Sequence, residues 1–383
     1  MINSNQSQKY RPWVDRRKKG SAMGFVRGMN IDKSLFLGLL VLAILGLVVL
    51  YSASGQDWAT MNRQIIRLTI AFVLMLLVAQ IPPHQLAFWT PWFFGLGLLL
   101  LLAVLAFGDV GKGAQRWLNL GIFRFQPSEL MKIVVPMMVA WYFSEKGIPP
   151  KFTRLLGGIV IIMIPVVLIA KQPDLGTALL IGAAGGFVLF FTGISWWLIG
   201  GFIGIIAAAA PLVWFNLMHS YQRQRVLTFL NPETDPLGSG YHIIQSKIAI
   251  GSGGVFGKGW LNGTQSQLDF LPERSTDFIF AVIAEEFGFL GILVLLSVFL
   301  FIILRGIRIT FQAQDTYTRL LSGSIVLTFM IYLFVNVGMV SGLLPVVGVP
   351  LPLISYGGTS VVTLMIAFGI LMSIHTHRKL LPS

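Results

Sequence analysis

The segment LPERSTDFIFAVIAEE, residues 271–286, runs directly into FGFLGILVLLSVFLFIIL, residues 287–304. A polar stretch that ends in Asp277 therefore meets an apolar run long enough to cross a bilayer, which takes about 20 residues. The start of the helix carries two more acids, Glu285 and Glu286. Carboxylates are costly in lipid and are usually functional there. The segment predicts a membrane helix with Asp277 at the point where a long loop meets the membrane surface.

The composition of the whole chain is that of a membrane protein. Of its 383 residues, 55% are hydrophobic and 11% are charged, whereas soluble domains carry roughly 25% charged residues. The mean hydropathy is +0.78. The chain has no cysteine, which excludes disulfides, thiolate catalysis and cysteine–zinc sites. The histidines are scattered and form no HExxH pattern, so the sequence predicts no set of metal ligands.

Apolar runs of spanning length recur along the chain and predict an all-α polytopic membrane protein with about ten transmembrane helices. The predicted spans lie near residues 34–54, 64–80, 88–107, 127–144, 155–171, 175–193, 196–218, 277–304, 317–340 and 353–374. We expect one transmembrane domain over residues 34–375, with a long extracytoplasmic loop, residues 219–276, between spans seven and eight. An even number of spans places both termini on the same side.

Both ends of the chain are basic, which favours a cytoplasmic location. Residues 1–33 are predicted to form a basic cytoplasmic arm, because their Lys and Arg side chains suit anionic lipid. Residues 376–383 are expected to form a short cytoplasmic tail. The first apolar run has no cleavage site of small residues and reads as a retained helix. The net charge of +13 is spread along a membrane protein, which argues against a nucleic-acid partner.

Two connections that this topology places outside, residues 108–126 and 219–276, are also basic. External positive charge opposes the usual insertion bias and needs another cause, such as a pyrophosphate or another anion at the outer surface. The candidate cations in these loops are Arg116, Arg223, Arg225 and Lys258. Trp117, next to Arg116, is either an interfacial anchor or part of the same site.

Asp277 has two possible roles that can coexist. It can cap the N-terminus of the following helix, as Asp commonly does, or act as a general base at the outer membrane face. Glu285 is expected about 12 Å further along the helix, which is too far for a pair of catalytic carboxylates. We expect Glu285 and Glu286 to form structural ion pairs inside the bundle.

A second group of polar residues opens the fourth span. Pro127 suits the first helical position, and Glu129 and Lys132 are three residues apart, hence neighbours on one helix face. They predict either a plain ion pair or a cavity in which Lys132 holds an anion while Glu129 orients it. Asp174 is a candidate cap for the sixth span.

Two irregular segments are also distinctive. The glycine-rich stretch 251–259 is not a phosphate-binding Walker loop, because Gly259 follows Lys258 where Ser or Thr is required. We expect it to be a flexible, closely packed loop. Residues 343–358 contain apolar prolines that cannot continue a helix. Irregular backbone at membrane depth has to be buried or line a cavity, so this segment is predicted to dip into the protein beside the site.

These motifs resemble the SEDS (shape, elongation, division and sporulation) family, and within it the polymerases of rod shape. The matching segments are GAQRWL (113–118), FQPSE (125–129), QPDLGT (172–177), YQRQR (221–225), DPLG (235–238), GYHIIQSKIAIGSGG (240–254), GKGW (257–260), FLPERSTDFIF (270–280) and PLISYGG (352–358). They cover nearly the whole chain beyond the N-terminal arm and occur in the family's order.

The resemblance implies a peptidoglycan glycosyltransferase in the bacterial inner membrane. It would polymerise lipid II at the periplasmic face, with release of undecaprenyl pyrophosphate from the growing glycan. The acid that matches Asp277 is the expected base. The candidate contacts for lipid II and its pyrophosphate are Arg116, Trp117, Glu129, Lys132, Arg223, Arg225, Lys258 and Ser355. The resemblance also implies a class B penicillin-binding protein as partner within the elongation complex, and assistance by a divalent cation, Mg²⁺ or Mn²⁺.

Two other functions use similar features. A flippase of lipid-linked precursors would share the cavity, cations and lipid grooves, but we would expect ionisable residues through the full depth of the membrane. Here the polar residues gather toward the outer half, except Glu285, Glu286 and Asn336. A non-catalytic scaffold for a partner enzyme would tolerate the loss of Asp277, whereas a polymerase would not.

Overall fold

The computed structural model describes residues 30–378 except 112–113, 120–123, 146, 213, 216–217, 219, 235–237 and 269. Most of the N-terminal arm and of the C-terminal tail predicted above lies outside these residues. The helices and strands are α2 (Lys33–Ala53), α3 (Trp58–Ala79), α4 (Pro83–Phe107), β1 (Asp109–Gly111), β2 (Ala114–Asn119), β3 (Arg124–Phe125), α5 (Pro127–Ser144), α6 (Phe152–Lys171), α7 (Leu175–Phe191), α8 (Trp196–Leu212), α9 (Ser220–Leu230), the 3₁₀ helix η2 (Pro232–Thr234), α10 (Ser239–Gly253), α11 (Thr264–Gln267), α12 (Ile279–Gln312), α13 (Thr316–Val340) and α14 (Thr359–Thr376).

Each of the ten predicted spans coincides with a helix of the structure. In the described part of the chain, seven helices are long and apolar enough to cross a membrane: α2, α3, α4, α6, α12, α13 and α14. The other three predicted spans correspond to the shorter or more polar helices α5, α7 and α8. The chain is therefore a multi-pass membrane protein, and the count of ten crossings stays a prediction.

The all-α class is wrong at one connection. Residues 109–125 include a three-stranded antiparallel sheet in the order β1-β2-β3, with Asp109 opposite Trp117 and Leu118 opposite Phe125. Pairing short strands satisfies backbone N–H and C=O groups of a segment that is not helical. The strands are too short to give a recognisable alternating pattern, so the sequence predicts only a loop here.

Helix starts follow local chemistry. The carboxylates of Asp32, Asp57 and Asp174 accept hydrogen bonds from backbone N–H groups of the first turns of α2, α3 and α7, which stabilises helix N-termini. Pro127 occupies the first turn of α5, where its missing N–H costs nothing. The predicted cap at Asp174 and the predicted helix start at Pro127 are both confirmed.

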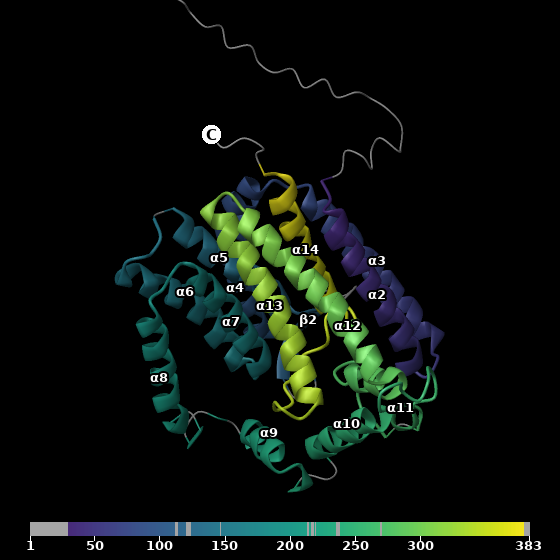
Figure 1. The fold of residues 1–383 in the computed structure, drawn as a ribbon. Coiled ribbons are helices and arrows are strands. Elements are labelled where there is room, and N and C mark those ends of the chain that lie inside the picture. Colours follow the sequence, from purple (N-terminus) through teal and green to yellow (C-terminus); the bar gives the residue numbers. More distant parts are fainter. Residues whose placement is uncertain are drawn as a thin grey trace, which may run out of the picture.

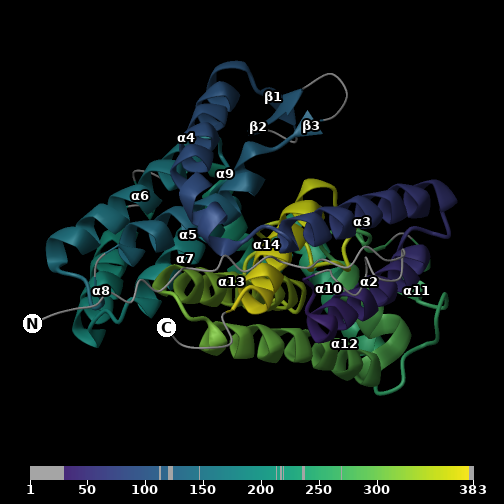
Figure 2. The ribbon, with the colours of Figure 1, turned by 90° about the horizontal axis from the view of Figure 1, so that it is seen from above.

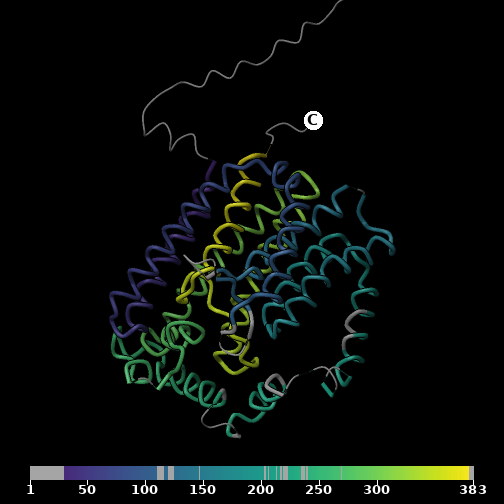
Figure 3. Tube along the Cα trace, turned by 180° about the vertical axis from the view of Figure 1, so that it is seen from behind, coloured from purple at the N-terminus to yellow at the C-terminus, as the bar shows by residue number. Residues whose placement is uncertain are grey.

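The helices form one bundle whose two described chain ends lie at the same end (Figure 1). Asn30 Nδ2 is 3.1 Å from His377 Nε2, which confirms that the ends meet. The helices α9, α10 and α11 from residues 219–276 lie at the opposite end (Figures 1 and 3). Viewed along the bundle, α13 and α14 lie between α5 and α7 on one side and α2 and α3 on the other (Figure 2).

Helix α12 is interrupted at Gly288, whose φ of 63° lies in the left-handed region that glycine tolerates best. The glycine-rich loop supplies the hydrogen bonds that the break removes. Lys258 N donates to Glu285 O and Gly259 N to Glu286 O, while Gly254 O and Val255 O accept from Phe289 N and Leu290 N, all at 2.9–3.1 Å. The predicted close packing of this loop is confirmed, and we call this arrangement the glycine clasp.

The end of the bundle that carries the two described chain ends is held by a buried ion pair. Asp32 caps α2 and also accepts hydrogen bonds from Arg305 Nε and Nη2 on α12, at 3.0 and 2.7 Å to Oδ2. Burial alone would raise the pKa of Asp32, but the hydrogen bonds from Arg305 and from Leu35 N outweigh it, so the pKa lies below its usual value. A carboxylate with a lowered pKa stabilises the fold above its unfolded pKa, and this contribution is lost as pH falls through the folded pKa.

We expect Asp32→Asn to lower stability by about 2 kcal/mol at neutral pH, because hydrogen bonds to charged groups contribute roughly 1.5–3 kcal/mol. The two proteins should converge at acidic pH, where Asp32 of the wild type is itself protonated. Thermal unfolding of both proteins in detergent, across pH 2 to 7, checks this, because the folded pKa of Asp32 lies below 3.8. An equal difference at every pH would contradict the assigned charge of Asp32.

Candidate active site

Asp277 lies just before α12 and does not cap it. The helix begins at Ile279, and its N-cap residue is Phe278, whose side chain makes no capping hydrogen bond. The capping interpretation of Asp277 is therefore wrong, because one additional turn residue separates the carboxylate from the helix start. Phe278 is itself held by His242 of α10, whose ring stacks on it at a centroid distance of 5.6 Å. The role of Asp277 has to be sought in its surroundings.

Three hydrogen bonds fix the backbone leading to Asp277. Tyr356 N donates to Ser275 O at 2.8 Å, Ser355 Oγ to Thr276 O at 2.6 Å, and Asn336 Nδ2 to Asp277 O at 2.9 Å. The donors come from α13 and from the segment that precedes α14, so consecutive carbonyls are anchored from two distant parts of the chain. This positions the carboxylate in the way that a catalytic group requires.

The irregular segment 341–358 dips into the bundle, as predicted (Figure 3). Val349, Leu351 and Ile354 are buried. Its backbone is held by Asn336, which also donates to Val349 O at 2.7 Å. Gly348 has a φ of 73°, and a Cβ there would lie 3.5 Å from Oδ2 of Asp277. The Asp277 carboxylate therefore faces this segment.

Ser355 was predicted to contact substrate, and the structure gives its hydroxyl another use. Ser355 is buried; its Oγ accepts from Leu351 N at 2.8 Å and donates to Thr276 O. Because the hydroxyl both accepts and donates a hydrogen bond to backbone groups, Ser355 acts as a positioning residue for the Asp277 segment. Its contact with substrate stays a prediction.

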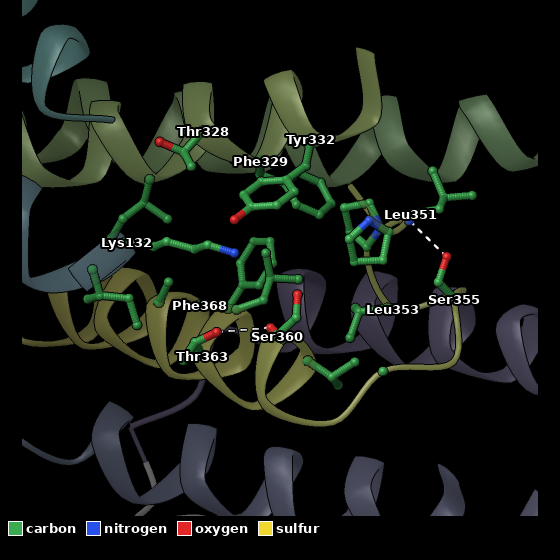
Figure 4. Close-up of a pocket in the computed structure, with 18 of the residues that line it drawn as sticks. Lys132, Thr328, Phe329, Tyr332, Leu351, Leu353, Ser355, Ser360, Thr363 and Phe368 are labelled. Carbon is green, nitrogen blue, oxygen red and sulfur yellow. Dashed lines mark hydrogen bonds between the residues drawn. The ribbon is translucent and has the colours of Figure 1, made fainter. Parts of the chain in front are cut away.

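Lys132 lines a small cavity between α5, α13 and α14 (Figure 4). Lys132 Nζ is 2.7 Å from Glu129 Oε1, and Thr363 Oγ1 donates to the other carboxylate oxygen at 3.3 Å. The ammonium also lies 5.2 Å from the ring centroid of Tyr332. The cavity of about 50 Å³ is lined by Lys132, Ser355 and the prolines of the dipping segment. The ion pair is confirmed, and Lys132 does line a cavity that reaches the anchor of Asp277.

Arg116 of β2 is bound to the connection between α6 and α7. Its Nη2 donates to Pro173 O at 2.6 Å, and its Nε lies 3.5 Å from Oδ2 of Asp174. The same carboxylate oxygen accepts from Gln126 Nε2 at 3.3 Å. Trp117 follows in the strand and is half-buried. The sheet is thus held next to the start of α5, and the charge of Arg116 is partly neutralised.

Arg223 and Arg225 lie on α9, which packs against α10 and η2. Arg223 Nη2 donates to Phe215 O at 3.0 Å, and Arg225 is exposed. Figure 1 shows α9 at the end of the bundle, beside α10 and below the helices that line the cavity. The structure does not bring these two arginines into contact with Lys132 or with Asp277.

Lys258 binds Glu285 at 2.8 Å, which confirms the predicted structural ion pair of this acid. Glu285 is fully buried and also accepts hydrogen bonds from Gln265 N and Ser266 N, at 2.9 and 3.2 Å. Glu286 accepts a short hydrogen bond from Ser52 Oγ. It has no cation partner within the described residues, so the ion pair predicted for this acid is wrong. The ammonium of Lys258 therefore holds the glycine clasp, which is a different role from the predicted contact with substrate.

We expect Lys258→Met to destabilise the protein by about 2 kcal/mol, since hydrogen bonds to charged groups contribute roughly 1.5–3 kcal/mol and the Lys258 side chain is 27% exposed. Thermal unfolding in detergent measures the effect. Lys171→Met is the matched control, because Lys171 is exposed at the end of α6. Similar midpoints for both variants would show that the Glu285 pair contributes little.

The described residues include no group of three or more His, Cys, Asp or Glu side chains placed to hold a metal ion. The divalent cation that the resemblance implies stays a prediction, and we assign no chemical step to a metal.

Three site residues were not singled out from the sequence: Tyr332, Thr363 and Gln126. Each lies within or next to an apolar span, so a polar side chain among apolar neighbours was the available signal. Asn336 is also a polar residue within an apolar span, and the sequence pointed only to its depth in the membrane. The contacts that show its role join residues 59 positions apart, which sequence spacing does not reveal.

Comparison with known proteins gives concordant results. The family model FtsW/RodA/SpoVE, described as cell cycle protein, matches residues 32–380. The peptidoglycan glycosyltransferase MrdB of Escherichia coli K12 is 55% identical over 92% of this chain and 95% of its own. The peptidoglycan glycosyltransferase RodA of Treponema pallidum is 33% identical over 92% of this chain and 99% of its own.

Solved structures share the fold. A chain from a structure described as the structural coordination of polymerization and crosslinking by a peptidoglycan synthase complex has a TM-score of 0.78 and 33% identity, covering 90% of this chain and 97% of that one. The rod shape determining protein RodA of Thermus thermophilus has a TM-score of 0.70 and 27% identity, covering 92% and 100%.

Proposed function

The chain belongs to the FtsW/RodA/SpoVE family and is a peptidoglycan glycosyltransferase, and on this premise we propose that it polymerises lipid II into glycan strands with Asp277 as the general base. The observation that carries the proposal is the anchoring of Ser275, Thr276 and Asp277 by three hydrogen bonds from α13 and the dipping segment.

The proposed reaction joins two lipid-linked sugars. The C4 hydroxyl of the N-acetylglucosamine of lipid II attacks the anomeric carbon at the reducing end of the growing strand. Asp277 takes the hydroxyl proton, the bond to undecaprenyl pyrophosphate breaks, and a β-1,4 link forms with inversion. The carboxylate suits this role because it can accept a proton from a hydroxyl placed within hydrogen-bond reach.

The leaving pyrophosphate gains negative charge as the bond breaks, and fixed cations stabilise that charge. Lys132 is the cation that lines the cavity beside the Asp277 anchor, with Glu129 orienting it. Arg116, Arg223, Arg225 and Lys258 stay candidates from the sequence. We propose assistance by a divalent cation only from the family resemblance.

We further propose that the protein works in the plasma membrane during lateral wall elongation, with both termini cytoplasmic and the Asp277 end periplasmic. The basic N-terminal arm and the shared location of the two described chain ends support this orientation. The solved relative named as a peptidoglycan synthase complex couples polymerization to crosslinking. That coupling supports a class B penicillin-binding protein as partner.

The experiment that tests the function uses lipid II in detergent micelles, where nothing can be flipped. Purified protein with its penicillin-binding partner should convert lipid II into a ladder of glycan strands on a gel. A chain that forms no strands in micelles but moves lipid II across vesicle membranes would be a flippase instead.

A further inference from the structure

Three of the five cations predicted for substrate are paired with carboxylates of the protein itself, and the other two, Arg223 and Arg225, do not contact Asp277 or Lys132. Lys132 faces Glu129 at 2.7 Å, Lys258 faces Glu285 at 2.8 Å, and Arg116 lies 3.5 Å from Asp174. A pyrophosphate bound by these groups would compete with an existing carboxylate. Uncompensated positive charge near Asp277 therefore has to come from other residues.

Two arginines on α3, Arg63 and Arg67, supply such charge. Arg67 lies about 14 Å from the start of α3 and about 18 Å from its end, at a rise of 1.5 Å per residue. Since α3 is long and apolar enough to span the membrane, Arg67 is at membrane depth from either side. A cation at that depth is costly and marks a functional site by default.

Arg67 has most of its binding capacity unused. Its guanidinium stacks on Tyr356, with Cζ 4.7 Å from the ring centroid. Within the described residues it has no hydrogen-bond acceptor and no carboxylate partner, although a guanidinium carries five N–H donors. Leaving those donors unsatisfied in lipid would be unfavourable, so water or an anionic ligand has to meet them.

Arg63, one turn away on the same helix face, contacts the same tyrosine. Its Nε donates to Tyr356 Oη at 3.1 Å. Its nearest carboxylate is Asp57 at 3.9 Å, and the two side chains are 54% and 48% exposed, so this ion pair is weak. The pair therefore presents nearly two positive charges beside Tyr356.

The arginine pair is connected to the catalytic segment. Tyr356 N holds Ser275 O, two residues before Asp277. Gln64, between the two arginines, bonds Ser355 O and Gly357 N, each at 3.4 Å. Gly357 also lines the Lys132 cavity. The arginines and the Lys132 cavity thus both adjoin the same short stretch of backbone, residues 355–357.

We propose that Arg63 and Arg67 form a second anion subsite that binds the pyrophosphate of a polyprenyl-linked sugar. The proposal rests on the polymerase function, in which two lipid-linked pyrophosphates, of donor and acceptor, are present in each transfer. One cavity cation cannot hold both. Guanidinium groups suit the task because their planar fork binds phosphate oxygens in pairs, and α3 borders the lipid from which the polyprenyl chain enters.

The test measures binding of undecaprenyl pyrophosphate to the full chain in detergent, by the ligand concentration that gives half-maximal thermal stabilisation. For the Arg63→Gln/Arg67→Gln double variant we expect that concentration to rise at least tenfold. Arg308→Gln is the matched control, because Arg308 is exposed and lies near the C-terminal end of α12. This variant should bind the ligand as the wild type does. Values within twofold for all three proteins would overturn the proposal.

Two further arms separate the alternatives. If phosphatidylglycerol protects the wild type equally well and loses its effect in the same double variant, the pair is a phospholipid headgroup site and the substrate assignment is overturned. If the double variant does not fold, Arg67→Lys keeps the charge without the fork and should bind at least threefold more weakly; equal binding would refute the proposal. If the wild type forms glycan ladders and the variants bind undecaprenyl pyrophosphate as tightly as the wild type does, only this inference fails. If the wild type forms no ladders, the polymerase function itself fails.

Discussion

Asp277→Asn is expected to abolish polymerisation while leaving the fold intact. The amide is nearly isosteric with the carboxylate but cannot accept the proton of the attacking hydroxyl, and loss of a general base costs about 10²–10⁴-fold in rate. The hydrogen bonds that anchor residues 275–277 use backbone carbonyls, so the substitution leaves them in place. The initial rate of undecaprenyl pyrophosphate release measures the effect.

Asp315→Asn is the control for this variant. Asp315 is the N-cap residue of α13, and Asn caps helices about as well as Asp does, so its rate should equal that of the wild type. A release rate for Asp277→Asn within threefold of the wild type, with the same thermal midpoint, would show that the base is another residue.

Gly257→Ala is expected to give the largest loss of stability, about 3 kcal/mol. Gly257 has a φ of 78°, and an added Cβ would lie 2.1 Å from Glu286 O. An L-residue in this left-handed conformation costs roughly 1–2 kcal/mol, and forcing an extra methyl group into a packed site costs about 1–3 kcal/mol more. Because Gly259 N and Lys258 N bond the interrupted part of α12, the clasp would have to open.

The matched control is Gly251→Ala in α10. A Cβ at Gly251 meets nothing within 4 Å, and Ala is favoured over Gly in a helix by up to roughly 1 kcal/mol. Thermal unfolding should therefore separate the two variants widely. Equal midpoints would contradict the assignment of the clasp as the element that stabilises the break in α12.

The spans could be predicted from the sequence because each depends on a continuous apolar run. The pair Glu129–Lys132 was equally accessible, since residues three apart on a helix are neighbours. Asp174 and Pro127 were found from local rules for helix starts. All these features are decided within a few residues of chain.

The features that the sequence analysis missed depend on tertiary contacts. Asn336 reaches Asp277 and Ser355 reaches Thr276 across separations of 59 and 79 residues, and no spacing rule predicts such contacts. Lys258 was assigned to substrate because its loop is basic, whereas its partner Glu285 lies 27 residues away. Arg67 lies inside the predicted span 64–80 and Arg63 just before it, where an arginine also reads as an end-of-helix cation that extends toward water.

We propose that this chain forms the glycosidic bond and that the Asp277 carboxylate takes part in forming it. The most direct measurement compares wild type and Asp277→Asn, each purified with the penicillin-binding partner, by gel analysis of glycan strands made from lipid II. We expect strands from the wild type and none from Asp277→Asn. Strands of similar amount and length from both proteins would contradict it.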